Sequence, residues 1–459
     1  MSSATALDRL GMPAFSYPPF RRFFASNLLA NTGIFLFMAA FGWFIQVHTG
    51  SAAMVGLASA IMGLPWLLLM LHAGMLTDRL GARRLVAWSF VGGGIVMAFV
   101  AVVALLPDPS VALLLAVVFG MGDAMAIGAP GSMTIVPELV PPAAVSSAVG
   151  LNFLLLNVAR IAGGFSAGWL LSGGREPGWT ILLGALCFGI PGLVVWRLPT
   201  REPTRQTRTI GGRGLVGPIT EAARYAVRYP TLGVILLLSA GPGLIGLPYN
   251  FLLPVAAQEL GIGAQGLGLL LGAAGTGGLV AGLLNEHLQR RLGQGRSIFV
   301  GLSSAAGGLI VFGVGVPLAA SLIAIAFVGG GFVIYASSSL TLVQALAPPS
   351  FRGRLTSVFS LLYWGLMPIG GLLGGIVAQL SSAHMAMLLA GFGLVGLGIL
   401  AGALRPQVLT LGVSRDGMSI RGDLRGTGVE RPMVDLPRSG PGSPRAPVAA
   451  GAGAGVEEG

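Results

Sequence analysis

Twelve long apolar runs, nearly free of charge, limit what this chain can fold into more than any other feature. Each approaches or exceeds the roughly 20 residues that a helix needs to cross a hydrocarbon core. Only 9% of all residues are charged, against roughly 25% in soluble domains. The runs lack the alternation of barrel strands, so the sequence predicts an all-α integral membrane protein. The predicted spans are 23–47, 52–76, 85–106, 111–136, 144–171, 178–198, 231–256, 265–286, 297–315, 318–343, 355–380 and 385–404.

The 27 basic residues, all of them arginine, sort to one side of the predicted membrane. Links after odd-numbered spans hold only Arg175. The arginines near the opposite ends of the spans are Arg79, Arg83, Arg84, Arg197, Arg201, Arg205, Arg208, Arg213, Arg224, Arg228, Arg290, Arg291, Arg296, Arg352 and Arg354. Because cytoplasmic loops are rich in basic residues, we expect both termini in the cytoplasm and the chain in a bacterial cell membrane. The formal charge of +11 then needs no nucleic-acid partner.

The chain repeats itself at an offset of about 208 residues. GMLTDRLGARR from Gly74 aligns with GLLNEHLQRRL from Gly282, and ELVPPAA from Glu138 pairs with ALAPPSF from Ala345 within one residue of that offset. A parallel repeat of six spans is typical of transporters built from two equivalent halves. The sequence therefore predicts two six-helix bundles related by a pseudo-twofold axis.

Polar segments set the predicted domain limits. A cytoplasmic N-terminal segment is followed by two bundles with a polar linker between them, and by a tail rich in Gly, Pro, Arg and Ala for which we expect disorder. The ranges are 1–22 for the N-terminal segment, 23–198 for the first bundle, 199–230 for the linker, 231–404 for the second bundle and 405–459 for the tail.

The link between spans two and three resembles the cytoplasmic signature of the major facilitator superfamily. The matching residues are Gly74, Leu76, Asp78, Arg79, Gly81, Arg83 and Arg84. Within the superfamily the chain resembles secretion-type exporters, including siderophore exporters and macrolide-efflux-like proteins, through FRRFFASNLLANTG, PELVPP, NVARIAGG and FRGRLTSVFSLLYWGLMPIGGLLGG. One departure is Gly163-Gly164, where antiporter-type members often carry Gly-Pro. The resemblance implies a secondary transporter that works by alternating access.

The signature also predicts a conformational latch. Asp78 ends span two, where a carboxylate can accept hydrogen bonds from the exposed amides that begin a neighbouring helix. The resemblance implies that this neighbour is span eleven, which begins near Leu355, and that the contact holds the outward-open state. Gly282, Glu286 and Arg291 form the repeat of the latch. The alternative is that these residues act only as a topology signal.

Asp123 and Arg160 are charged residues near the middle of spans four and five. A charge at the centre of a membrane helix costs about 2.5–3.5 kcal/mol on insertion scales, so we expect both side chains to face a cavity and to interact. One hypothesis is that Asp123 carries the coupling proton while Arg160 biases its release. The other hypothesis is a static ion pair that orients two helices.

Other polar and aromatic residues within the spans are candidates for the substrate cavity, although each could instead bond to a neighbouring helix. They are Asn27, Asn31, Asn157, Tyr249, Asn250, Tyr335, Gln344, Tyr363 and Trp364. The glycines of spans five, eight and eleven are expected mainly to allow close helix packing. So few charges among apolar and aromatic groups favour a neutral or weakly charged amphipathic substrate.

Catalytic motifs are missing from the sequence. It has no phosphate-binding Walker loop, nucleophile elbow, paired carboxylates or metal-ligand spacing. We therefore expect no enzyme activity, no cofactor and no bound metal. The prediction is a monomeric, proton-coupled exporter of a small amphipathic compound, in contact with membrane lipid. The alternatives are a lipid or lysolipid translocator of the same fold, or a membrane sensor or scaffold that does not transport.

Overall fold

The computed structural model of this chain describes residues 12–199, 221, 224–348, 351–413 and 420–422. The side chains of residues 70–75, 78–79, 153 and 420–421 lie outside this description. So do most of the predicted linker and the tail beyond residue 422. All the described residues belong to one compact unit, Met1–Gly428.

Twelve helices in the described part of the chain are long and apolar enough to cross a membrane, which confirms the predicted fold class. Ten are continuous: α2 (Pro18–Thr49), α3 (Ala52–Leu80), α4 (Ala82–Ala104), α5 (Val111–Glu138), α6 (Val145–Ser172), α7 (Pro177–Trp196), α11 (Gly263–Leu292), α12 (Gln294–Gly313), α13 (Leu318–Leu346) and α16 (Ala383–Leu404). The seventh span comprises α9 (Pro230–Gly241), the π-helix η3 (Pro242–Gly246) and α10 (Tyr249–Glu259). The eleventh comprises α14 (Arg352–Ser360), the π-helix η4 (Leu361–Gly365) and α15 (Met367–Leu380).

Order continues beyond the last span, where the sequence predicts disorder from residue 405. A 3-10 helix, η5 (Pro406–Thr410), leads into strand β1 (Gly412–Val413), which pairs antiparallel with β2 (Ile420–Arg421). Val408 and Leu411 are buried, and the amide of Gly295 donates to the Leu411 carbonyl at 2.9 Å. These two apolar side chains fix the segment against the start of α12. Two other short helices, η1 (Pro13–Ser16) and η2 (Pro142–Ala144), precede α2 and α6.

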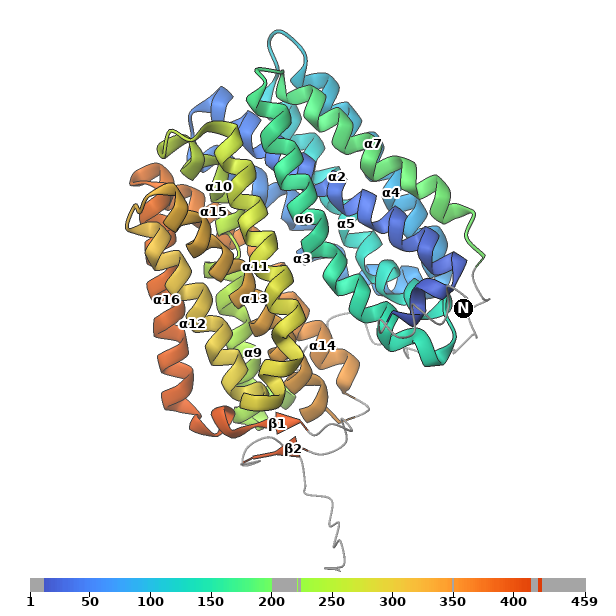
Figure 1. Cartoon of the computed structure of the whole chain (residues 1–459), viewed down its shortest axis with the longest axis vertical. Helices are drawn as coiled ribbons and strands as arrows, with labels where there is room; N and C mark the ends of the chain where they lie inside the picture. Colours follow the sequence, from blue (N-terminus) through green and yellow to red (C-terminus); the bar gives the residue numbers. More distant parts are fainter. Residues whose placement is uncertain (1–11, 200–220, 222–223, 349–350, 414–419, 423–459) are drawn as a thin grey trace, which may run out of the picture. The chain divides into compact units, whose positions relative to one another are not determined.

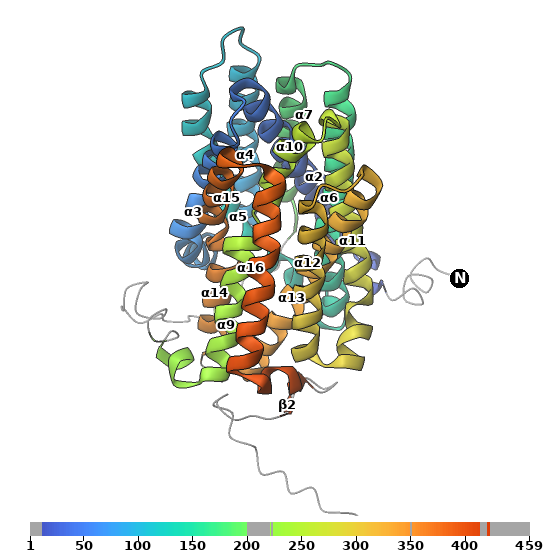
Figure 2. The same ribbon diagram turned by 90° about the vertical axis from the view of Figure 1, so that its left-hand side faces the viewer.

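The helices form two bundles that meet along two helix pairs (Figures 1 and 2). In the first bundle α4 packs on α5 and α7, and in the second α12 packs on α13 and α16. Between the bundles α6 packs on α11 and α3 packs on α15. These pairs join span five to span eight and span two to span eleven, so exchanging the two halves of the sequence turns one pair into the other. This is the pseudo-twofold arrangement that the repeat predicts.

Glycines bring the paired helices into contact, as the sequence predicts. A Cβ added at Gly168 would lie 2.7 Å from the Cα of Gly268. At the other interface, a Cβ on Gly56 would lie 2.7 Å from the Gly371 carbonyl oxygen and 2.8 Å from the Gly375 Cα. Side chains larger than hydrogen would therefore push the two bundles apart.

The repeat is also visible in two glycine turns. Gly81 (φ 83°) joins α3 to α4, and Gly293 (φ 81°) joins α11 to α12 with nearly the same backbone conformation. A positive φ is accessible to glycine without strain. The sequence alignment places Gly81 opposite Gln289 instead, because α11 runs about one helical turn further than α3 before its turn.

Candidate substrate cavity

A cavity of about 390 Å³ lies between the two bundles. Its walls come from helices of both halves: α2 to α7 on one side, and the segments around η3, α11 and η4 on the other. This volume falls within the roughly 300–1,000 Å³ of small-molecule sites. We call the end of the bundle where α2 begins and α16 finishes the termini end, and the opposite end the far end.

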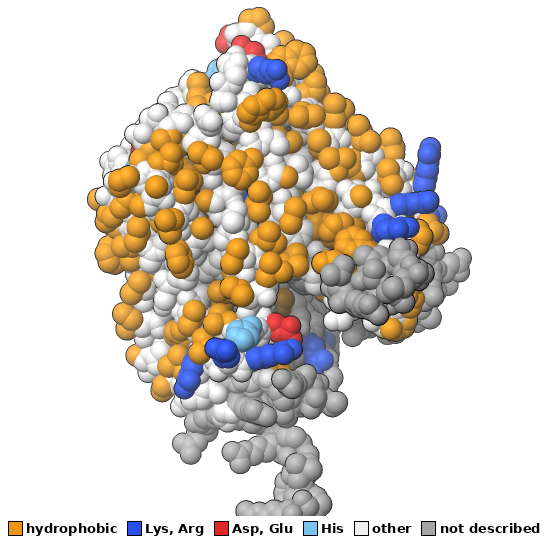
Figure 3. All heavy atoms as spheres, in the orientation of Figure 1, with side chains coloured by type: hydrophobic (Ala, Val, Ile, Leu, Met, Phe, Trp, Pro, Cys, Tyr) orange, Lys and Arg blue, Asp and Glu red, His pale blue; other side chains and the backbone are white. Residues whose placement is uncertain are grey.

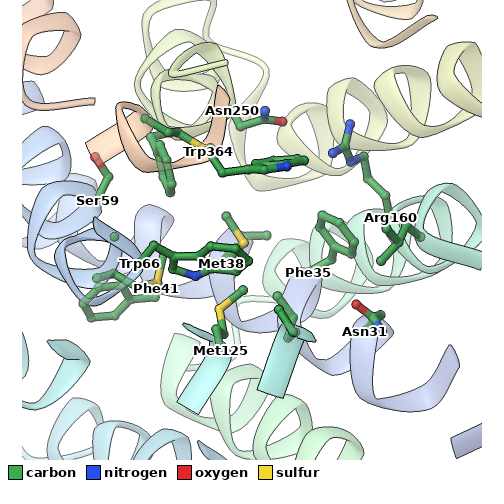
Figure 4. A pocket seen from close by; sticks show the side chains of 18 of the residues that line it. Asn31, Phe35, Met38, Phe41, Ser59, Trp66, Met125, Arg160, Asn250 and Trp364 are labelled. Carbon is green, nitrogen blue, oxygen red and sulfur yellow. The ribbon is translucent and has the colours of Figure 1, made fainter. Parts of the chain in front are cut away.

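Methionine and aromatic side chains supply the largest apolar groups of the cavity wall (Figure 4). Methionine is flexible and polarisable and adapts to different apolar shapes. Of these residues, only Trp364 is predicted from the sequence. A signal for two others is the helical spacing that places Met125 and Met133 on one face of α5. The members are Phe35, Met38, Phe41, Met62, Trp66, Phe90, Met125, Met133, Phe188, Phe251, Trp364 and Met367.

Three asparagines of the first bundle are linked at the cavity. The Asn27 amide donates to Asn152 Oδ1 at 2.8 Å, and the Asn31 amide donates to Asn27 Oδ1 at 2.9 Å. On the opposite wall the Asn250 amide donates to the Leu247 carbonyl at 3.1 Å. Each of these amides therefore already has a partner within the protein.

Some of the predicted cavity residues line the cavity and others do not. Those in the wall are Asn27, Asn31, Asn250 and Trp364. Asn157, Tyr249, Tyr335 and Tyr363 are instead buried among helices, and Gln344 is exposed. Asn157 packs on Gly278 of α11, and Tyr363 donates to the Phe332 carbonyl at 3.4 Å. These five side chains serve packing or solvation in this structure.

Arg160, which the sequence places in mid-span, lines the cavity. Its guanidinium carbon lies 5.2 Å from the centre of the Phe35 ring, a cation–π distance. Its Nε is buried and has no hydrogen-bond partner in the described part of the protein. Figure 4 shows the side chain reaching inward beside Phe35.

Asp123 does not meet Arg160. Its neighbours in sequence fix its direction: Gly122 packs on Met62 of α3, and the Ala124 side chain packs on Gly93 of α4. Asp123 therefore points between α3 and α4, about 200° around the helix from the cavity-lining Met125. Among the described residues no ion pair joins it to Arg160, and its Oδ1 is buried without a partner. The expected mutual contact in a cavity is absent from this conformation.

The far end of the cavity is closed by hydrogen bonds between the bundles. Gln46 donates to Gln258 Oε1 at 2.7 Å, and Ser51 donates to Gln379 Oε1 at 2.9 Å. Toward the termini end the cavity wall extends to Asn152. Figure 1 shows the two bundles in contact at the far end and diverging toward the termini end.

The signature region is only partly described. The predicted latch residues Gly74, Asp78 and Arg79 lie outside the residues whose side-chain surroundings are described. Gly81 makes the turn after α3, as above. Arg83 donates to the Leu198 carbonyl at 2.8 Å, and Arg84 is exposed.

The repeat of the signature does not contact span five through its charges. Glu286 forms an ion pair with Arg290 on its own helix, and Arg291 is exposed. Of these three described residues, Gly282 approaches the other bundle: a Cβ added there would lie 3.2 Å from the Leu154 side chain.

The start of α14, the predicted partner of the latch, is covered by the end of the linker. Arg354 forms an ion pair with Glu221 at 2.5 Å. The Tyr225 ring stacks on Phe351 with centroids 5.0 Å apart. These contacts join the linker to the second bundle and were not predicted.

Comparisons with known proteins agree with this geometry. The model of the transmembrane secretion effector family matches residues 11–410. The multidrug efflux pump Tap of Mycolicibacterium fortuitum is 26% identical over 386 residues, covering 82% of this chain and 92% of that pump. The enterobactin exporter EntS of Citrobacter koseri is 26% identical over 390 residues, covering 84% and 91%.

Solved structures show the same fold. A mutant of the nucleoside transporter NupG superposes with a TM-score of 0.72 at 14% identity, covering 84% of this chain and 99% of that one. An inward-facing, unoccupied bacterial homologue of the lysosomal transporter Spinster gives 0.65 at 17% identity, covering 85% and 98%. With its twelve spans, paired bundles and central cavity, the chain belongs to the transmembrane secretion effector family of major facilitator superfamily transporters.

Proposed function

We propose that this protein exports a small amphipathic organic compound from the bacterial cytoplasm by alternating access, as a monomer driven by the proton gradient. The observation that carries the proposal is the cavity between the bundles, whose walls combine methionine and aromatic side chains with a few amides. Such a wall suits apolar bodies of varied shape. The names of the relatives Tap and EntS, a multidrug efflux pump and an enterobactin exporter, support an outward direction.

The distribution of arginine supports an orientation with both termini in the cytoplasm. The exposed Arg84 and Arg291 lie at the termini end, where the second bundle ends in a band of basic side chains below an apolar surface (Figure 3). Basic residues remain preferentially on the cytoplasmic side. In this orientation the closed far end faces outward, so the structure corresponds to an inward-facing state ready to take up substrate.

The proposed transport cycle rocks the two bundles about their glycine contacts. The hydrogen bonds of Gln46 and Ser51 at the far end would break, and the termini ends would close. In the resulting outward-open state we propose that Asp78 caps the start of α14. In the present structure, the start of α14 carries the Glu221–Arg354 pair. The linker and the latch would therefore act on the same helix end in different states of the cycle.

Asp123 remains our candidate for the coupling proton, because its carboxyl lies in mid-span and one of its oxygens is buried without a partner. Its direction between α3 and α4 changes the proposed route. A proton bound there would not compete with substrate in the cavity, and its effect would pass through the packing of α5 on α3. A static ion pair with Arg160 receives no support from this conformation.

Transport by the purified full chain in liposomes, with an imposed pH gradient, tests the proposal. We expect gradient-dependent movement of the neutral dye phenyl-naphthylamine or another member of an amphipathic panel, and its loss when a protonophore is added. Asp123→Asn should abolish gradient-driven transport and leave dye binding unchanged. Full transport by Asp123→Asn would remove Asp123 from the coupling role, and failure to transport any member of the panel would contradict export.

A further inference from the structure

Arg160 carries the one charge among the described residues that line the cavity. The other described lining side chains are apolar, aromatic, amide or hydroxyl groups. Arg160 is half-buried, and its Nε is fully buried without a partner. An unpaired charge that is partly withdrawn from water is costly. The cavity therefore holds a cation that the described part of the protein does not neutralise.

Neighbouring groups do not supply the missing partner. The guanidinium carbon lies over the Phe35 ring, 5.2 Å from the ring centre. The Asn31 and Asn250 side chains donate their N–H groups to Asn27 and to the Leu247 carbonyl, and their oxygens accept no hydrogen bond from Arg160 in the described part of the protein. Nε remains buried and without an acceptor. Figure 4 shows Arg160 at one end of the apolar wall, so a molecule in the cavity could touch both.

Acidic residues in the described spans have other partners or lie elsewhere: Glu286 pairs with Arg290, and Glu138 is the last residue of α5. Asp123 points between α3 and α4, as its neighbours require. Glu259 accepts the amide of Ala383 at 2.8 Å and lies 3.0 Å from His384 Nδ1 at the start of α16. Both carboxylates are thus placed where they do not compensate Arg160.

We infer that the transported compound carries an anionic group on an apolar body, and that Arg160 binds this group. The planar guanidinium presents paired N–H donors that match a carboxylate, sulfonate or phosphate. The methionine and aromatic walls take the apolar body. This inference rests on the proposed function. It replaces the neutral or weakly charged substrate that the sequence favours with an amphipathic compound that carries an anionic group.

A pair of fluorescent dyes with one skeleton isolates the charge. Anilinonaphthalene sulfonate carries a sulfonate, and phenyl-naphthylamine lacks it. Binding of each is titrated to the full chain in nanodiscs of zwitterionic lipid, with empty nanodiscs subtracted. We expect the sulfonate to bind more tightly than the neutral dye by about tenfold or more, the factor expected of one hydrogen bond to a charged group.

Substitutions at Arg160 then assign the effect. Arg160→Gln should weaken sulfonate binding about 10- to 100-fold and leave binding of the neutral dye within about twofold. Arg160→Lys keeps the charge without the planar fork. Its affinity for the sulfonate should fall between that of the wild type and that of Arg160→Gln. Arg175→Gln, on an exposed arginine outside both the cavity and the signature, is the matched control and should change binding of neither dye. Equal weakening of both dyes by Arg160→Gln, or of neither, would overturn the inference.

The same preparation separates this inference from export itself. Sulfonate selectivity that depends on Arg160 can hold even if no pH gradient drives transport, and transport of the neutral dye can hold without that selectivity. Lysophosphatidylglycerol is added as a competitor to identify the source of the anion. Displacement of the sulfonate by this lysolipid would place the anion on a lipid head group, and displacement only by small aromatic carboxylates would place it on a soluble metabolite.

Discussion

The two bundles share one plan but differ in the helices that face the cavity. In the first bundle α2 and α6 run without a break for 32 and 28 residues. Their counterparts in the second bundle, spans seven and eleven, each pass through a five-residue π-helix, η3 or η4. The first bundle also carries the asparagine chain and Arg160. The duplicated sequence has thus diverged into a half with unbroken cavity helices, which carries the asparagine chain and Arg160, and a half whose two corresponding cavity helices bend.

Prolines explain where the second bundle bends. Pro248 follows η3 and Pro368 follows η4, and neither has an N–H to donate to a carbonyl in the preceding turn. The amide of Leu247 instead reaches the Pro242 carbonyl at 2.7 Å, five residues back. Gly243 of η3 packs directly against the backbone of η4. Single π turns are frequent at functional sites, and here two of them meet beside the cavity.

The largest effect is expected where the bundles touch, because both halves depend equally on those contacts. Gly56→Leu and Gly168→Leu each place a side chain against backbone of the other bundle. Overpacking of this kind costs about 1–3 kcal/mol, and we expect both variants to lose transport and to unfold at lower temperature. Transport rate and thermal unfolding of the purified variants measure this.

Smaller changes keep that prediction testable if the leucine variants fail to fold. Gly56→Ala and Gly168→Ala should each lose transport and thermal stability, but less than the leucine variants do. Gly92→Ala is the control, since a Cβ there meets nothing within 4 Å. A strong loss at one interface with none at the other would contradict the pseudo-twofold equivalence of the two helix pairs.

The second prediction separates the bent half from the straight half. Pro248→Ala restores an N–H at the bend and should favour a straight seventh span. We expect transport to slow by about fivefold, the factor that corresponds to ~1 kcal/mol, while binding of phenyl-naphthylamine and thermal stability are retained. Transport and binding are measured on the same preparation.

Pro130→Ala in α5 is the matched control, because this proline lies within a continuous helix of the first bundle. It should leave transport nearly unchanged. Equal slowing by both variants would show that the π turns have no special part in the cycle.

The comparison of the halves also shows what the sequence can reveal. The spans and the glycine contacts follow from local patterns, because an apolar run and a small residue have much the same meaning in any membrane helix. The direction of one polar side chain does not follow. Tyr249 and Asn250 are adjacent in sequence, yet the first is buried behind the cavity and the second lines it. Likewise, Asp123 points away from the cavity although it lies only two positions before the cavity-lining Met125.

A third prediction concerns the hydrogen bonds that close the far end. Gln46 and Gln258 come from opposite bundles and join at 2.7 Å, with Gln46 buried. In a double-mutant cycle of Gln46→Ala and Gln258→Ala, we expect a coupling of about 0.5–1.5 kcal/mol in the free energy of unfolding. Gln344→Ala, on an exposed glutamine, is the control. Additive effects in the cycle would show that this bond does not stabilise the closed far end.

The smallest effect is expected at the described end of the linker, which contacts the second bundle. Arg354 and Glu221 are 40% and 36% exposed, so solvent screens the pair, and surface pairs contribute about 0.2–1 kcal/mol. Glu221→Gln should therefore lower stability by less than about 1 kcal/mol, with a loss that shrinks as salt is raised, because screening already weakens the pair. Arg84→Gln is the control in the first bundle. A loss above this range, or one that salt does not reduce, would mean that the linker holds α14 through more than this exposed pair, with the stacking of Tyr225 on Phe351 as the next contact to remove.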